Sequence, residues 1–218
     1  MKWVKYIWIL LMIYIVCSAR TCNENEEASE KQKEQYTINL LNSVKQVFTS
    51  DSLSDHLLKA YEITATEKLN DFADFMKIIS DTTLDLRFRQ HAAELVRDLF
   101  VSDESELSGW SKSYPEPGLN ILDNLISYSI SKGVPYWNQP MQVNFNKPFT
   151  SINDSTFTGD LSFKYKSLSF SGQDTSEIVS GRMLIDIFLM KRSKTFGKDR
   201  LTVWDVYLGD MNEDNERD

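Results

Sequence analysis

The sequence is poor in the side chains that most often carry chemistry. Its 218 residues include two cysteines, Cys17 and Cys22, and two histidines, His56 and His91. Both cysteines lie near the N-terminus, so the remaining chain has no disulfide, no thiol nucleophile and no thiolate metal site. His56 has no second ligand at a metal-like spacing, and His91 falls on a charged helical face. We therefore expect no metal and no cofactor, and we expect both histidines to be exposed.

Recognisable catalytic and nucleotide-binding motifs are also missing. The sequence contains no glycine-rich phosphate loop, no G-x-S-x-G and no H-E-x-x-H. An excess of positive charge is absent as well: the chain carries −8, and the part beyond Cys22 has 21 basic against 32 acidic residues, or −11. Such a charge opposes the counterion release that drives nucleic-acid binding. These absences favour a protein without enzymatic activity and argue against nucleic acid as a partner.

One long apolar run is present, at the N-terminus. Eleven apolar or aromatic residues run from Tyr6 to Val16, behind the positive charges of Lys2 and Lys5. A bilayer span needs about 20 apolar residues, whereas about 10–14 suit the core of an export signal. The segment that follows the run is acidic, which favours keeping the N-terminus inside. The pattern predicts an export signal over residues 1–22 and an extracytoplasmic body.

The end of this signal can be read in three ways. Small residues at Cys17 and Ala19 would suit cleavage before Arg20 and release of a secreted protein. An uncleaved anchor is a second reading, because Trp3 and Tyr14 could lie at a membrane interface. The short apolar run followed by a cysteine also resembles a bacterial lipoprotein signal. This resemblance implies lipidation at Cys22, or alternatively at Cys17, and a periplasmic or outer-membrane location in the cell envelope.

Beyond the signal we expect one domain between two polar ends. Residues 23–34 read as a flexible acidic spacer, and residues 210–218 as a disordered acidic tail. The first part of the domain has apolar residues at helical spacing. The predicted helices are 35–48, a short helix beginning at Ser52 or Ser54, a helix capped by the Thr64-Ala65-Thr66-Glu67 box, 83–100, and 119–130.

The second part of the domain has the period of β-strands. We expect an edge strand around Met141–Phe145 and three long antiparallel strands, at 156–170, 178–191 and 201–208. A change of phase near Lys166-Ser167 predicts a β-bulge. The segment 183–190 is apolar on both faces apart from Asp186, so it should be central in the sheet or lie at a subunit interface. A short strand is also possible around Leu107.

This element order resembles the cone-shaped α+β fold of the NTF2-like superfamily. The resemblance is carried by FRQHAAELVRDLFV at 88–101, the helix at 118–128 and the final strands ending in LTVWDVYLG, and it covers roughly 35–209. It implies N-terminal helices packed on a curved antiparallel sheet of about four strands. Cystatin-like or lipocalin-adjacent arrangements are the alternatives. Members of the superfamily include cavity enzymes and noncatalytic binding or dimerising modules, so the fold does not choose a function.

Asp186 is the one candidate for chemistry. It interrupts an apolar strand, where burial would oppose the charged form of a carboxyl group. Inside a cone-shaped cavity it could act as a general base, with Tyr165 or Trp204 placing a ligand. The competing interpretation is that Asp186 faces solvent on the outer side of the sheet or pairs with Arg182 or Lys191.

Two classes of function follow from these observations. The first is a membrane-tethered, noncatalytic interaction or structural module of the envelope, with a protein partner or a second copy of itself. A structural subunit of a larger surface machine differs from it mainly in stoichiometry. The second is a small-ligand-binding or enzymatic cavity protein that uses Asp186.

Overall fold

The computed structural model describes residues 35, 53–114, 116–134, 136–171, 174–196 and 199–214. Backbone contacts divide the chain after Ser50, and the fold described below belongs to the second unit, Asp51–Asp218. The predicted export signal with Cys17 and Cys22, the acidic spacer and, apart from the helical Gln35, the first predicted helix lie outside the described residues.

The longest helix among the described residues, α2, spans Asp55–Ser80 without a break. Its N-cap is Ser54, whose side-chain oxygen accepts a hydrogen bond from the backbone N–H of Leu57 at 3.4 Å. The sequence predicted two helices here, with the second capped at Thr64, and this was wrong. The Thr64 hydroxyl instead donates to the carbonyl of Ala60 within the helix, at 3.3 Å. A threonine followed three residues later by glutamate also fits the exposed side of a continuing helix.

Three shorter elements complete the helical part. They are α3 (Leu86–Leu99), the 3-10 helix η1 (Trp110–Ser113) and α4 (Leu122–Lys132). The short strand expected near Leu107 is a single antiparallel bridge between Glu106 and Ile121. Helix α4 ends at Gly133, whose φ of 68° and ψ of 163° suit glycine almost alone.

Four antiparallel strands follow and form one sheet in the order β1-β2-β3-β4. Their bounds are β1 Tyr136–Asn153, β2 Thr156–Ser171, β3 Asp174–Phe196 and β4 Asp199–Glu213. The predicted bulge is confirmed, because the register between β2 and β3 shifts between Ser167 and Leu168. The central place of β3 and the edge place of β1 are confirmed as well.

The C-terminal strand is longer than the sequence indicated. We expected a disordered tail from Asp210, but β4 continues through Glu213, and Met211 is fully buried. A register shift opposite Asp186 makes this possible: Ile185 pairs with Met211, whereas Ile187 pairs with Leu208. The extra residue in β4 is a bulge that restores the inward direction of Met211.

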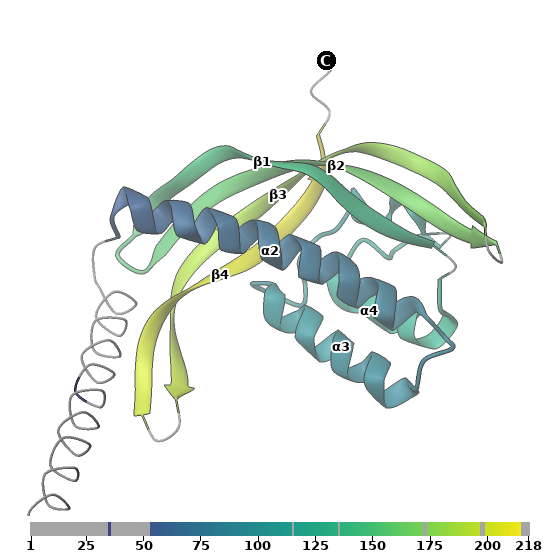
Figure 1. Cartoon of the computed structure of the whole chain (residues 1–218), viewed down its shortest axis with the longest axis horizontal. Helices are drawn as coiled ribbons and strands as arrows, with labels where there is room; N and C mark the ends of the chain where they lie inside the picture. The colour runs from purple at the N-terminus through teal and green to yellow at the C-terminus, as the bar shows by residue number, and fades with distance from the viewer. Residues whose placement is uncertain are drawn as a thin grey trace, which may run out of the picture. The chain divides into compact units, whose positions relative to one another are not determined.

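The helices lie beneath the arch of the curved sheet (Figure 1). Alternate residues of the central strand, among them Ile185 and Ile187, are fully buried against them. The core continues into the helices through Leu69, Val96 and Leu125. The fold is therefore α+β, with helices packed on a curved antiparallel sheet of four strands, as predicted.

Candidate functional surfaces

Asp186 lies on the face of the sheet that points away from the helices. Its neighbours Ile185 and Ile187 are buried in the core, and side chains alternate between the two faces of a strand. Asp186 itself is partly buried, and its cross-strand partner is another acid, Asp160 of β2. The position matches the competing interpretation of the sequence, in which Asp186 is on the outer side of the sheet.

The surroundings of Asp186 are acidic. Burial, Asp160 and Asp210 raise the pKa of its carboxyl group, and the nearby Lys147 opposes this rise. The Lys147 ammonium lies 2.7 Å from a carboxylate oxygen of Asp160, and this pair raises the pKa of Lys147. Asp186 therefore lies near two other carboxyl groups, Asp160 and Asp210, and near one lysine, Lys147.

Tyr165 and Trp204, the predicted ligand-placing residues, lie elsewhere. Tyr165 is 2% exposed on the helix-covered face, and burial raises the pKa of its hydroxyl. It pairs with Gly181, where a Cβ atom would approach the Tyr165 ring to 3.0 Å. Trp204 pairs with Lys191, ten residues further along β3, and packs on Phe157 with ring centroids 5.3 Å apart.

These positions separate the three predicted site residues. Tyr165 of β2 and Trp204 of β4 pair with positions of β3 that are ten residues apart, or about 33 Å along the strand. Asp186 lies between them along the strand but on the other face. The structure therefore does not bring Asp186, Tyr165 and Trp204 together around one ligand.

Hydrophobic side chains fill the space between the sheet and the helices. Trp110, 1% exposed, enters from η1 and lies 4.7 Å from Phe72 of α2 between ring centroids, while Phe72 contacts Phe100 at 5.1 Å. Beside Trp110, the buried Asn138 donates to the Trp110 carbonyl at 3.0 Å, and its side-chain oxygen accepts from the hydroxyls of Ser113 and Ser167. The polar groups at this point satisfy one another and hold η1 against the sheet.

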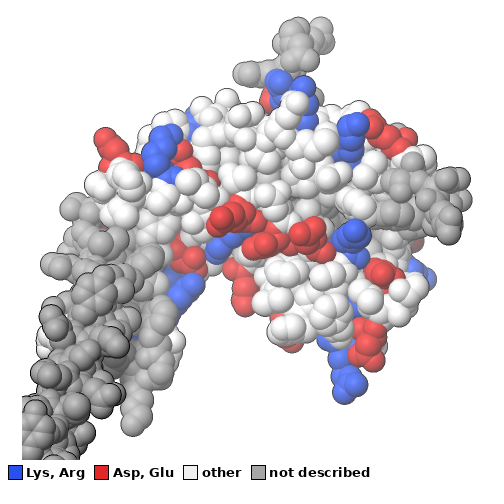
Figure 2. All heavy atoms as spheres, viewed as in Figure 1, with Lys and Arg blue, Asp and Glu red and all other residues white. Residues whose placement is uncertain are grey.

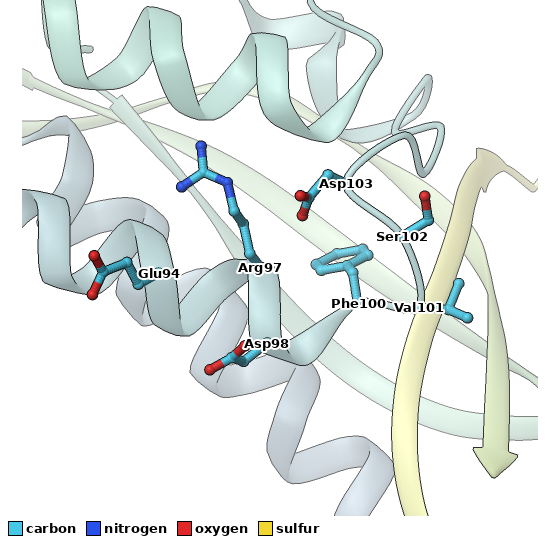
Figure 3. Close-up of a pocket in the computed structure, with 7 residues that line it drawn as sticks. All are labelled: Glu94, Arg97, Asp98, Phe100, Val101, Ser102 and Asp103. Atoms are coloured by element: carbon cyan, nitrogen blue, oxygen red, sulfur yellow. The ribbon is translucent and has the colours of Figure 1, made fainter. Parts of the chain in front are cut away.

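A hollow of about 470 Å³ lies at the end of α3 (Figure 3). Three acids line it together with Arg97, whose side chain points away from that of Asp98. Arg97 is held by Asp123 of α4, with its Nη2 and Nε atoms 2.6 and 3.2 Å from one carboxylate oxygen. The geometry is that of an ion pair joining two helices at an acidic surface, and acidic side chains also gather along α2 (Figure 2).

A second hollow, of about 230 Å³, separates α2 from β1. Lys77 of α2 lies over the ring of Trp137 there, 3.7 Å from the ring centroid, in a cation–π contact. Asp74 and Gln139 also line this hollow. The contact anchors the edge strand to the helix.

At the opposite edge of the sheet, Lys68 of α2 reaches β4. Its ammonium donates to the Val206 carbonyl and lies 3.2 Å from Asp205, which also pairs with Lys194 at 2.6 Å. The two lysines lower the pKa of Asp205 against the effect of burial. Burial and Asp205 raise the pKa of the neighbouring Tyr207 to about 12, so this hydroxyl stays protonated at neutral pH. The cluster covers part of the edge of β4 with charge, a common protection of sheet edges.

The outer face also carries a basic region that the sequence analysis did not identify. Lys164 and Arg182 are directly opposite each other on β2 and β3 and line a hollow of about 340 Å³ with Met141 and Ser180. Arg182 also lies 3.8 Å from Asp214. Alternation along each strand could have placed these residues on the outer face. The register between the strands, which a single sequence does not reveal, puts like charges opposite each other.

Other predicted features can be placed briefly. His56 and His91 are exposed, and His91 lies 3.4 Å from Glu94. Within the described ranges, no group of three or more histidine, cysteine or acidic residues is arranged to hold a metal ion. No helix among the described residues is both long enough and apolar enough to span a bilayer.

Comparisons with known proteins give little beyond this geometry. No family model matches the sequence, and no curated protein matches it. Among solved structures, the chain is similar to the crystal structure of a provisionally assigned scytalone dehydratase from Novosphingobium aromaticivorans. The identity is 8% and the TM-score 0.31, over 73% of this chain and 92% of that one. A similarity at this level does not assign a family or an activity to this chain.

Proposed function

We propose that this protein is a noncatalytic interaction or structural module, exported from the cytoplasm and tethered to the bacterial cell envelope through its N-terminus. The observation that supports the noncatalytic part is the packing of aromatic side chains beneath the sheet. Phe72 contacts Trp110 and Phe100 there, and a ligand cavity beneath the sheet would need the space that these rings take up. Charged side chains such as Lys164, Arg182 and Asp186 lie on the outer face of the sheet, where they suit contact with a partner.

The tether is proposed from the sequence. An apolar core too short for an ordinary span, two lysines before it and an acidic segment after it support export. The location of both cysteines beside this core supports a lipid at Cys22. A secreted protein released by cleavage before Arg20 is the alternative.

Metabolic labelling with a palmitate analogue tests the tether. We expect label on the parent chain and on Cys17→Ser, and no label on Cys22→Ser. The Cys17→Ser chain is the matched control, because it removes a thiol from the same segment. If the unlabelled parent chain accumulates in the culture medium instead, the secreted alternative replaces the tethered one.

Isolation of the full chain from membranes tests the interaction role. In mild detergent we expect the chain to migrate in size-exclusion chromatography with a partner or with a second copy. A monomer that copurifies with nothing would contradict an interaction module.

The alternative function, a small-ligand-binding or enzymatic protein using Asp186, is favoured by the raised pKa of that carboxyl group. It needs a ligand site on the outer face, since Tyr165 is buried on the other side of the sheet. Asp186→Asn tests it directly. A loss of ligand affinity or activity in a chain with unchanged thermal stability would support the enzyme, and unchanged affinity and activity would remove it.

A further inference from the structure

The charged residues of the outer face form an ordered pattern on β2 and β3. Three successive cross-strand pairs point away from the helices: Lys164 with Arg182, then Ser162 with Leu184, then Asp160 with Asp186. The order along both strands is thus a basic pair, a neutral pair and an acidic pair. Each step is two residues, or about 7 Å.

This pattern is unfavourable within one chain. Like charges directly opposite each other on neighbouring strands are destabilising, and here two such pairs occur within four residues. Lys147 lies 2.7 Å from Asp160, and Asp214 lies 3.8 Å from Arg182, so each pair has an opposite charge beside it. Exchanging Lys164 with Asp160 would have paired opposite charges on both rows. The sequence instead separates the two signs along the strands.

From this arrangement we infer that the outer face binds the same face of a second copy, with a twofold axis running across the strands at the Ser162–Leu184 pair. Such an axis lies midway between the two sheets and parallel to them. A residue on one side of the axis along a strand therefore faces the residue that is equally far on the other side in the second copy. Asp186 then faces Arg182 of the other copy, and Lys164 faces Asp160, which is 8% exposed beside Lys147. Each interaction occurs twice, because an interface with this symmetry is formed by the same patch on both subunits.

The dimensions of packed sheets agree with these contacts. Two sheets face each other at a separation of about 10 Å, and long lysine and arginine side chains can reach a carboxylate across that distance. The partly buried Leu184 lies at the axis, where it meets its own copy. Among the residues that the structure describes, helices α2, α3 and α4 lie beneath the arch of the sheet, on the side opposite this face (Figure 1).

The inference rests on the proposed function, because it names a second copy as the partner of the interaction module. Charge complementarity favours that occupant over an unrelated protein: the patch supplies both signs at equal distances from one line. An unrelated protein of uniform charge would be repelled by one half of the patch.

Reversing the charges of the acidic pair in one variant and of the basic pair in another tests the dimer. One full-length variant carries Asp160→Lys and Asp186→Lys, and a second carries Lys164→Asp and Arg182→Asp. We expect each alone to weaken the homodimer at least about a hundredfold in dissociation constant, measured by sedimentation in detergent. A mixture of the two variants should form heterodimers, detected by pull-down through two different tags, because opposite charges then face each other again.

The heterodimer separates loss of the interface from loss of folding, since unfolded chains would not pair selectively. A chain with all four reversals should regain the homodimer. The matched control carries Glu67→Lys and Asp71→Lys on the exposed side of α2; it has the net charge of the first variant and should dimerise like the parent.

Three results would overturn the inference: a monomeric parent, reversed variants that dimerise like the parent, or folded variants that do not pair when mixed. The proposed function fails separately. If the palmitate label is absent while the charge-dependent dimer persists, the tether is wrong and the dimer stands. If the label is present and another protein copurifies with a monomeric chain, the module stands and its partner is not a second copy.

Discussion

The two faces of the sheet differ in what the same strands present. On the helix-covered face, Ile185 and Ile187 are fully buried, while Asp186 between them lies on the outer face among other charges. A strand that is apolar over most of its length can therefore belong to the core on one side and to a charged surface on the other. Stability should therefore depend mainly on the covered face, and association mainly on the outer face. Substitutions on each face can test this difference.

The largest effect is expected at Trp110. Replacing it with alanine removes the side chain that fills the space beneath the sheet and its contact with Phe72. Truncation of a buried tryptophan typically costs about 3–5 kcal/mol, since the transfer energy and the cavity both count. Chemical denaturation should show this loss, and a cost below about 1 kcal/mol would mean that the interior is not packed as described.

The next effect is expected at Arg89, a buried cation that joins two helix ends. Its guanidinium donates to the carbonyls of Ile79, Ser129 and Ile130 at 2.8–2.9 Å, at the C-termini of α2 and α4. The negative ends of the two helix dipoles stabilise the charge there. Arg89→Met removes these three hydrogen bonds and should lower the free energy of unfolding by about 2–4 kcal/mol.

Arg89→Lys provides the control for charge alone. A lysine keeps the positive charge but cannot donate in a fork to carbonyls of two helices. We expect it to recover less than half of the loss in the same denaturation experiment. Full recovery would show that charge, and not the bridging geometry, holds the two helix ends.

The start of α2 should show a smaller effect that separates two possible caps. Ser54→Ala removes the hydroxyl that accepts from Leu57 and should cost about 0.5–2 kcal/mol. Thr64→Ala, at the cap that the sequence indicated, should be neutral or slightly stabilising, because alanine is the better residue inside a helix. Thermal melting of the two variants side by side would reveal a break in α2 if Thr64→Ala proved the more damaging change.

The contrast between Ser54 and Thr64 shows how far the sequence could predict this fold. The class, the central place of β3 and the bulge after Ser167 follow from periodicity, which depends on neighbours in the chain. The continuity of α2 does not, because packing against β1 and β4 overrides a local capping signal. The same limit applies to Asp186: alternation allowed the outer face, but only the pairing of β2 with β3 shows that Asp160 lies opposite it.

The smallest effect, and one of opposite sign, is expected at Asp186. Burial, Asp160 and Asp210 raise the pKa of this carboxyl group in the folded chain above its unfolded value. The folded state therefore binds the proton more tightly, so the charged form is penalised at neutral pH and the penalty disappears as pH falls through the raised pKa. Asp186→Asn should stabilise the monomer at pH 7 by about 0.2–1 kcal/mol, the range for a cross-strand like-charge pair.

The pH dependence of this gain distinguishes the monomer from a dimer. In dilute solution, the gain from Asp186→Asn should shrink as the pH is lowered from 7 toward 4, because the parent carboxyl group becomes neutral. At concentrations that favour the dimer, the same substitution should instead weaken association, since asparagine removes the charge that faces Arg182 of the other copy. Thermal melting at several pH values and two protein concentrations would measure both. If the gain at pH 7 were independent of concentration, Asp186 would lie outside any interface between copies, and the outer face would be a solvent-exposed surface.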